Sequence, residues 1–156
     1  MREIVERAWQ SLTSIPEAKI AALKCDLDDI EVFVDPLRLE QVFRNLFENA
    51  IAVSPSPAEI QVSSTLEHFA ERRMIRIFVR DNGPGFSSEQ REKAFEPFYP
   101  TRRKGTGLGL PICNRIVGQH QGWLEIAPNS EFGGCMVMVL PQSTGSKLVK
   151  KSSEKC

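Results

Sequence analysis

The sequence predicts an α+β fold, a two-layer sandwich in which a mixed, mostly antiparallel sheet is covered by about three helices. Two observations predict it. Apolar residues recur at helical spacing in separate parts of the chain, and strand-like segments with alternating or β-branched apolar residues lie between them. Two of these segments also follow one another across a short polar loop, as antiparallel neighbours do. Helices from separate parts of the chain can then pack on the sheet.

The N-terminal segment is the first expected helix. Its pattern begins at Met1, as if the chain were a domain excised from a longer protein. Residues 19–26 and 31–35 then predict two strands separated by an acidic turn. The apolar positions of the first helix are Ile4, Val5, Ala8 and Leu12.

The strongest helical pattern starts at Asp35-Pro36. Asp35 is a suitable N-cap, and Pro36 is favoured at the first helical position because its missing N–H leaves no hydrogen bond unmade. Residues 54–57 (Ser-Pro-Ser-Pro) end the helix, since proline cannot continue the backbone hydrogen bonds. The apolar positions are Leu39, Val42, Phe43, Leu46, Phe47 and Ala50.

The next two segments, 58–66 and 73–81, predict an antiparallel pair of strands joined by a polar loop around His68. A short helical stretch is expected from Ser87. Pro111 then lies in the first turn of another helix.

Gly122 ends that helix, and residues 123–127 and 135–140 predict the last two strands.

Length and composition favour one globular domain. The 156 residues are 41% hydrophobic and 26% charged, with a formal net charge of zero, so nothing indicates a nucleic-acid partner. The four cysteines show no Cys-x-x-Cys spacing. No apolar run reaches the ~18 residues that cross a bilayer. We expect a monomeric cytoplasmic domain over residues 1–142, whose parent protein could still be membrane-anchored, and a disordered tail over 143–156.

Asn45 and Asn49 are four residues apart on the second expected helix, so they share one face with Arg38 and Gln41. An amide oxygen is a suitable ligand for a hard cation such as Mg²⁺, which takes most of its charge compensation from nucleotide phosphates. The alternative is a pair of solvent-facing asparagines with poor helix propensity.

Asp81 ends a strand and precedes a turn-prone segment, Asp-Asn-Gly-Pro-Gly-Phe at 81–86. The period-two rule places Asp81 on the same face as Ile77 and Val79, opposite Arg76 and Arg80. A buried carboxylate needs a hydrogen-bond donor. Asp81 could instead cap the following turn, in which Gly83 and Gly85 serve the backbone geometry.

Glycines at 105, 107 and 109, in Gly-Thr-Gly-Leu-Gly-Leu (105–110), come before the last helix. Backbone amides and a helix N-terminus form an anion site that suits a triphosphate. The spacing is neither that of a P-loop nor that of the dinucleotide fingerprint. Without the other motifs, the segment could equally be a flexible hinge.

In this order, the three motifs resemble the N, G1 and G2 boxes of the ATP-binding domain shared by sensor histidine kinases, gyrase-type topoisomerases, heat-shock chaperone ATPases and mismatch-repair ATPases. The segment 95–98 (Phe-Glu-Pro-Phe) resembles the F box that marks the histidine kinases. The resemblance covers about residues 1–141 and implies a Bergerat-type fold that binds ATP and Mg²⁺.

The resemblance also implies roles for single residues. Asn49 is the expected magnesium ligand, Asn45 supports the phosphates and the water shell of the metal, and Asp81 accepts a hydrogen bond from the adenine amine. The other expected nucleotide-binding residues are Gly83, Gly85, Phe95, Phe98, Gly105, Thr106, Gly107, Leu108 and Gly109.

A short basic segment separates the F-box-like turn from the glycines. Arg102, Arg103 and Lys104 could form a lid that neutralises charge on the β and γ phosphates during transfer. The alternative is a solvated charged loop. A lid this short resembles that of nitrogen- and oxygen-responsive histidine kinases.

Two positions depart from common patterns of the superfamily. Many histidine kinases carry Lys or Arg three residues after the second N-box asparagine, where this chain has Ala52, so the lid becomes the expected cationic partner. Chaperone and gyrase-type ATPases place a catalytic Glu at the position of Asn45. Glu48 lies about 100° away around the helix, so hydrolysis is not the favoured reaction.

The expected phosphoacceptor is absent from this chain. Neither His68 nor His120 lies in a Ser-His-Glu motif such as kinase dimerisation helices carry. We therefore expect a histidine kinase catalytic domain that transfers the γ-phosphoryl group to a histidine-bearing dimerisation domain, with a response regulator downstream. The alternatives are a conformational ATPase, a sigma-regulating serine kinase of the same superfamily, and a non-catalytic nucleotide-sensing module.

Overall fold

The computed structural model describes residues 1–28, 31–69, 71–99, 106–128 and 133–142 of the chain. Its elements in chain order are α1 (Arg2–Gln10), two 3-10 turns (Ser11–Ser14 and Pro16–Lys19), β1 (Ala22–Asp26), α2 (Pro36–Val53), β2 (Glu59–Phe69), β3 (Arg72–Asp81), α3 (Ser88–Lys93), α4 (Gly109–Gln119), β4 (Trp123–Ile126) and β5 (Cys135–Pro141).

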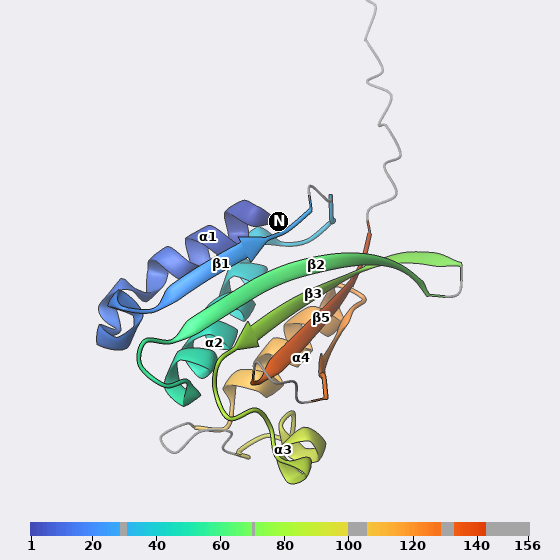
Figure 1. Cartoon of the computed structure of the whole chain (residues 1–156). Helices are drawn as coiled ribbons and strands as arrows, with labels where there is room; N and C mark the ends of the chain where they lie inside the picture. Colours follow the sequence, from blue (N-terminus) through green and yellow to red (C-terminus); the bar gives the residue numbers. More distant parts are fainter. Residues whose placement is uncertain (29–30, 70, 100–105, 129–132, 143–156) are drawn as a thin grey trace, which may run out of the picture.

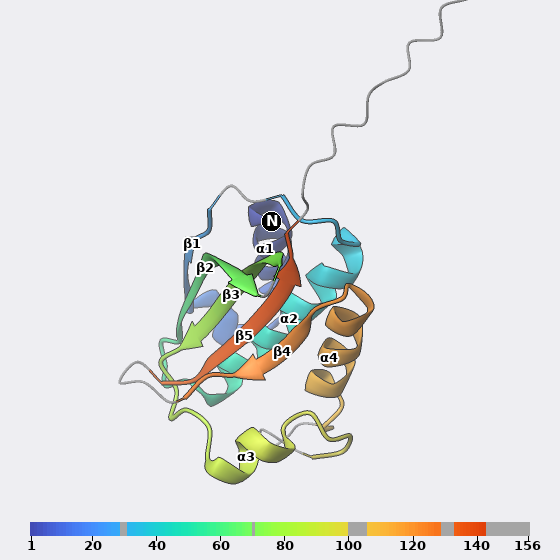
Figure 2. The same cartoon turned by 90° about the vertical axis from the view of Figure 1, so that its right-hand side faces the viewer.

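The strands form one mixed sheet in the order β1-β2-β3-β5-β4, in which only β1 and β2 pair in parallel. Helices α1, α2 and α4 pack on one face of this sheet, and the short α3 stands beyond the end of β3 (Figures 1 and 2). The predicted α+β sandwich, with its antiparallel β2–β3 pair, is confirmed.

The main core lies between this helical layer and the sheet. The predicted apolar stripe of α2 is buried, and Phe47 packs edge-on against Trp9 of α1 with ring centroids 5.4 Å apart. From β3, Ile75, Ile77 and Val79 enter the same core, as the period-two pattern predicted. Core residues of α2 and β3, such as Ala50 and Val79, also line the cavity described below.

Local capping fixes the start of α2. The Asp35 side chain accepts hydrogen bonds from the backbone N–H groups of Leu37 (2.9 Å) and Arg38 (3.2 Å), and Pro36 is the first helical residue. The backbone N–H of Asp35 donates to His120 Nε2 at 3.0 Å, which ties the end of α4 to the start of α2. The predicted cap is confirmed.

The strand predicted for residues 31–35 is wrong. The segment has no regular secondary structure, and the backbone N–H of Asp35 bonds His120 and no neighbouring strand. The strand-like alternation arises because Val32 and Val34 pack against the core, whereas Phe33 is 93% exposed. Half-burial of an irregular segment thus produced a period-two pattern.

Other boundaries also differ from the prediction. The strand predicted from residue 19 begins at Ala22, because a 3-10 turn occupies Pro16–Lys19. Strand β2 continues to Phe69, so His68 pairs with Arg73 within the hairpin and is not in a loop. The predicted tail, 143–156, lies outside the described residues.

Candidate functional site

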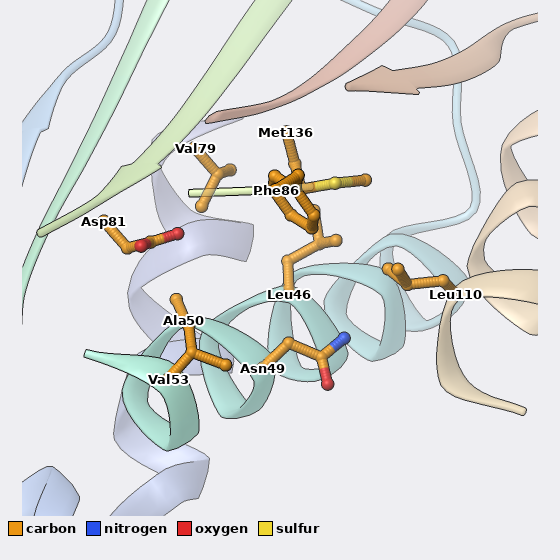
Figure 3. A pocket seen from close by; sticks show the side chains of 9 residues that line it. All are labelled: Leu46, Asn49, Ala50, Val53, Val79, Asp81, Phe86, Leu110 and Met136. Atoms are coloured by element: carbon orange, nitrogen blue, oxygen red, sulfur yellow. The ribbon is translucent and has the colours of Figure 1, made fainter. Parts of the chain in front are cut away.

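A cavity opens between α2, the end of β3 and the start of α4. It measures about 410 Å³ when the open space at its mouth is counted. Its walls are mostly apolar, and its polar side chains are Asn49 and Asp81. In Figure 3, the Asp81 carboxylate points into the cavity from one side, while the Asn49 amide lies on the side nearest Leu110. The lining residues are Leu46, Asn49, Ala50, Val53, Val79, Asp81, Phe86, Leu110 and Met136.

Asp81 is only 5% exposed, and the backbone holds its carboxylate in place. Its Oδ1 accepts a hydrogen bond from the Gly83 N–H at 2.9 Å, and Gly134 supplies a second backbone bond. Burial raises the pKa of Asp81, and these two hydrogen bonds oppose the rise. The result is a desolvated, oriented acceptor facing an apolar space.

The loop after Asp81 folds tightly over this carboxylate. A Cβ on Gly83 would lie 2.6 Å from Asp81 Oδ1, and Gly85 has a φ of 78°, which suits glycine. The Asn82 side chain accepts a hydrogen bond from the backbone N–H of Glu59 at 2.9 Å, which anchors the loop to β2. Phe86 then lines the cavity.

Asn45 and Asn49 lie on one face of α2, as their spacing predicted, but have different neighbours. Asn49 lines the cavity. Asn45 faces α4, where its Oδ1 is 3.5 Å from the position that a Cβ on Gly109 would take. Arg38 and Gln41 are both exposed.

The F-box-like segment contacts the glycine segment through its backbone. The Phe98 N–H donates to the Gly107 carbonyl at 3.0 Å, and a Cβ on Gly107 would lie 2.5 Å from the Phe98 carbonyl carbon. Gly107 has a φ of 70°, and its close approach to Phe98 excludes a side chain. The Phe98 side chain is 76% exposed, whereas Phe95 packs against the core.

The remaining predicted residues lie around the start of α4. Leu108 is the N-cap and Gly109 the first helical residue, while Thr106 is exposed. Arg102, Arg103, Lys104 and Gly105 lie outside the described residues.

Within the described part of the chain, no group of three or more His, Cys, Asp or Glu residues could hold a metal ion. The amide oxygen of Asn49 is of a type that can bind Mg²⁺ together with phosphates and water. The described helices also include none long and apolar enough to cross a membrane.

Comparison with known families identifies the fold. Residues 34–144 match the family described as histidine kinase-, DNA gyrase B- and HSP90-like ATPase. The chain belongs to this family. One curated relative is sporulation kinase C of Bacillus subtilis (strain 168), which is 38% identical to this chain over 114 residues. Another is the signal transduction histidine-protein kinase BaeS of Escherichia coli (strain K12), which is 39% identical over 118 residues.

Each of these alignments covers 72% of this chain, and the chain spans about a quarter of the length of these relatives. Among solved structures, the catalytic domain of histidine kinase ThkA is 28% identical with a TM-score of 0.74, covering 90% of this chain and 93% of that domain. The mycobacterial sensor histidine kinase MprB is 25% identical with a TM-score of 0.76, covering 91% of this chain and 94% of that one.

Two glycines beside Asp81 were not among the site residues predicted from the sequence. Gly133 and Gly134 lie against Asp81: a Cβ on Gly134 would lie 2.7 Å from Asp81 Oδ2, and one on Gly133 2.4 Å from the Asp81 carbonyl oxygen. The Asp81 N–H also donates to the Gly134 carbonyl at 3.0 Å. The only signal was a Gly-Gly pair before the last strand, which often marks close backbone approach.

Proposed function

We propose that this chain is the ATP-binding catalytic domain of a sensor histidine kinase. It binds ATP with Mg²⁺ and transfers the γ-phosphoryl group to a histidine on a separate dimerisation domain of the parent protein, from which a response regulator receives it. The observation that carries the proposal is the buried Asp81 carboxylate at one side of an apolar cavity whose other polar side chain is Asn49. The work of this domain takes place in the cytoplasm, where ATP is available.

The cavity suits a flat purine base. Its apolar walls can enclose the ring faces, and Asp81 can accept a hydrogen bond from the exocyclic amine of adenine. Guanine presents a carbonyl at that position, and a carboxylate repels it. Because Gly83 and Gly134 already hold the carboxylate, its orientation does not have to be established on binding.

Asn49, Asn45 and the N-terminus of α4 support the phosphate end of the nucleotide. Magnesium, when bound with ATP, neutralises phosphate charge and orients the γ-phosphoryl group. Asn49 would offer an amide oxygen to the metal, and Asn45 would support its water shell. Ala52 offers no cation, so we assign the phosphate clamp to Arg102, Arg103 and Lys104, whose short segment supports a nitrogen- and oxygen-sensor-like subtype.

The contacts of three side chains favour transfer to a partner over hydrolysis or self-labelling. Asn45 occupies the position at which chaperone and gyrase-type ATPases carry the catalytic glutamate. The Glu48 carboxylate accepts a hydrogen bond from Arg44 Nε at 2.9 Å on the helix surface. Both ring nitrogens of His120 are engaged, Nε2 by the N–H of Asp35 and Nδ1 by the Ile116 carbonyl. Neither His120 nor His68, which is exposed on β2, lies in a phosphoacceptor motif, so we expect the acceptor histidine on another domain.

The substitution Asp81→Asn tests the base site. It keeps the shape of the side chain but lets an amide donor face the adenine amine, so ATP affinity should fall by about tenfold to a hundredfold, or ~1.5–3 kcal/mol. Isothermal titration calorimetry on the folded variant measures the ATP affinity. Titration of GTP into the parent chain is the specificity control. Unchanged ATP affinity would remove Asp81 from the site.

A further inference from the structure

Strand β1 lies at one end of the sheet, so one of its two edges has no neighbour among the described strands (Figure 2). The backbone N–H of Ala22 donates to the Ala58 carbonyl at 2.8 Å, on the side of β2. In a parallel pair of strands, successive residues turn their backbone groups to opposite edges. Every second residue from Ala22 therefore faces β2, and the backbone groups of residues 23, 25 and 27 face the outer edge.

Arg2, at the start of α1, occupies this outer edge of β1. Its Nη1 donates to the Cys25 carbonyl at 3.2 Å, and its Nη2 donates to the Leu27 carbonyl at 3.1 Å. One planar guanidinium thus spans two successive outward-facing carbonyls. Hydrogen bonds from a charged donor are stronger than those between neutral groups. A strand that paired with this edge would have to displace Arg2 from both carbonyls.

The edge that Arg2 covers suits a second copy of the same strand. Unpaired N–H and C=O groups at a sheet edge are a template for another strand. In an antiparallel pair centred on Cys25, residue 24 of each copy lies opposite residue 26 of the other. Lys24 and Asp26 are both exposed, so this register brings opposite charges together twice. A pair centred on Lys24 would instead place two lysines opposite each other, so the charges favour the first register.

We propose that the outer edge of β1 is a surface for pairing with a second copy of this chain, and that Arg2 keeps it closed. Arg2 replaces the partner strand at the Cys25 and Leu27 carbonyls, which leaves the chain monomeric. The inference is independent of the proposed function, since it uses none of the residues assigned to the nucleotide.

The test measures self-association of the whole chain by sedimentation equilibrium. Arg2→Ala removes both hydrogen bonds to the edge. Arg7→Ala is the matched control, because Arg7 is also an exposed arginine of α1 but forms an ion pair with Glu40 of α2, at 3.4 Å. Should Arg2→Ala not fold by circular dichroism, Arg2→Met, which keeps the apolar stem of the side chain, takes its place.

Arg2→Ala should form a dimer with a dissociation constant at least about tenfold lower than that of the parent chain, because pairing no longer has to break charge-assisted hydrogen bonds. Arg7→Ala should match the parent chain. Adding Lys24→Asp to Arg2→Ala should abolish the dimer, since two carboxylates then face each other in each pair. Adding Asp26→Lys to that double variant should restore the dimer, because opposite charges face each other again.

A monomeric Arg2→Ala chain would overturn the inference. Equal association of Arg7→Ala, or a dimer that survives Lys24→Asp, would also overturn it, because the association would then not occur at this edge. Calorimetry should give the same Mg-ATP affinity for Arg2→Ala and the parent chain. The proposed function therefore stands or falls separately from this inference.

Discussion

At the scale of single residues, the site depends on two polar side chains in an otherwise apolar cavity. Asp81 could be placed from the sequence, because the alternation along its strand put it on the core face. Its two glycine neighbours at 133 and 134 could not, since they lie just before β5, more than fifty residues further along the chain. Contacts across such a distance depend on strand order, which a local pattern does not encode.

The substitution Asn49→Ala should remove the magnesium dependence of nucleotide binding, because it deletes the one amide oxygen that lines the cavity. Affinity for metal-free ADP should change less. Titrations with and without Mg²⁺ separate the two contributions. Gln41→Ala is the control, since Gln41 lies on α2 but is exposed. Full magnesium enhancement in Asn49→Ala would mean that another residue is the ligand.

The raised pKa of Asp81 predicts a pH dependence of ATP binding. A protonated carboxyl is a poorer acceptor for the adenine amine, so affinity should fall as the pH drops through this raised pKa, above the ~3.9 of an ordinary aspartate. Calorimetry across this pH range, compared with Asp81→Asn, measures the effect. An identical profile in the variant would assign the pH dependence to another group.

The raised pKa of Asp81 has the opposite effect on the stability of the protein without nucleotide. Asp81 binds its proton more tightly in the folded chain than in the unfolded chain. The contribution of Asp81 to the free energy of unfolding therefore decreases as the pH rises through the pKa that Asp81 has in the folded chain. Lowering the pH through this window should therefore weaken ATP binding while it relieves the cost of burying the Asp81 charge.

At the scale of elements, helix caps were predictable because their signals are local. Asp35-Pro36 marked the start of α2, and Ser87 caps α3 in a capping box with Gln90. The segment 31–35 was wrongly predicted as a strand, because alternating buried and exposed side chains indicate half-burial and do not require pairing with another strand. The link from Asp35 to His120 was also out of reach, since it joins two elements that are adjacent only in the fold.

Just after α4, the backbone is strained at a residue that can be substituted. Gln121 has a φ of 60°, a left-handed conformation that favours glycine. We expect Gln121→Gly to raise the free energy of unfolding by about 0.5–1 kcal/mol, because the native backbone angle then costs less. Urea denaturation with an unchanged m-value measures it. A lower midpoint would show that the Gln121 side chain contributes more than its strain costs.

At the scale of the whole molecule, the sequence predicted the layers but not the order of the strands. Strand β5 enters between β3 and β4, which brings the Gly133-Gly134 pair beside Asp81. The parallel pairing of β1 with β2 follows from the connection through α2, because a helix between two strands returns the chain in the same direction. The basic segment 102–104 lies outside the described residues, so its role as a clamp stays a prediction.

The central claim is that this chain holds the phosphoryl donor but not the acceptor. Incubating it with γ-labelled ATP and Mg²⁺, with and without the histidine-bearing domain of its parent protein, tests this most directly. We expect acid-labile label on the added domain alone, and neither label on this chain nor rapid ATP hydrolysis in its absence. Stable labelling of His68 or His120 in the isolated chain, or steady hydrolysis without a partner, would contradict the account.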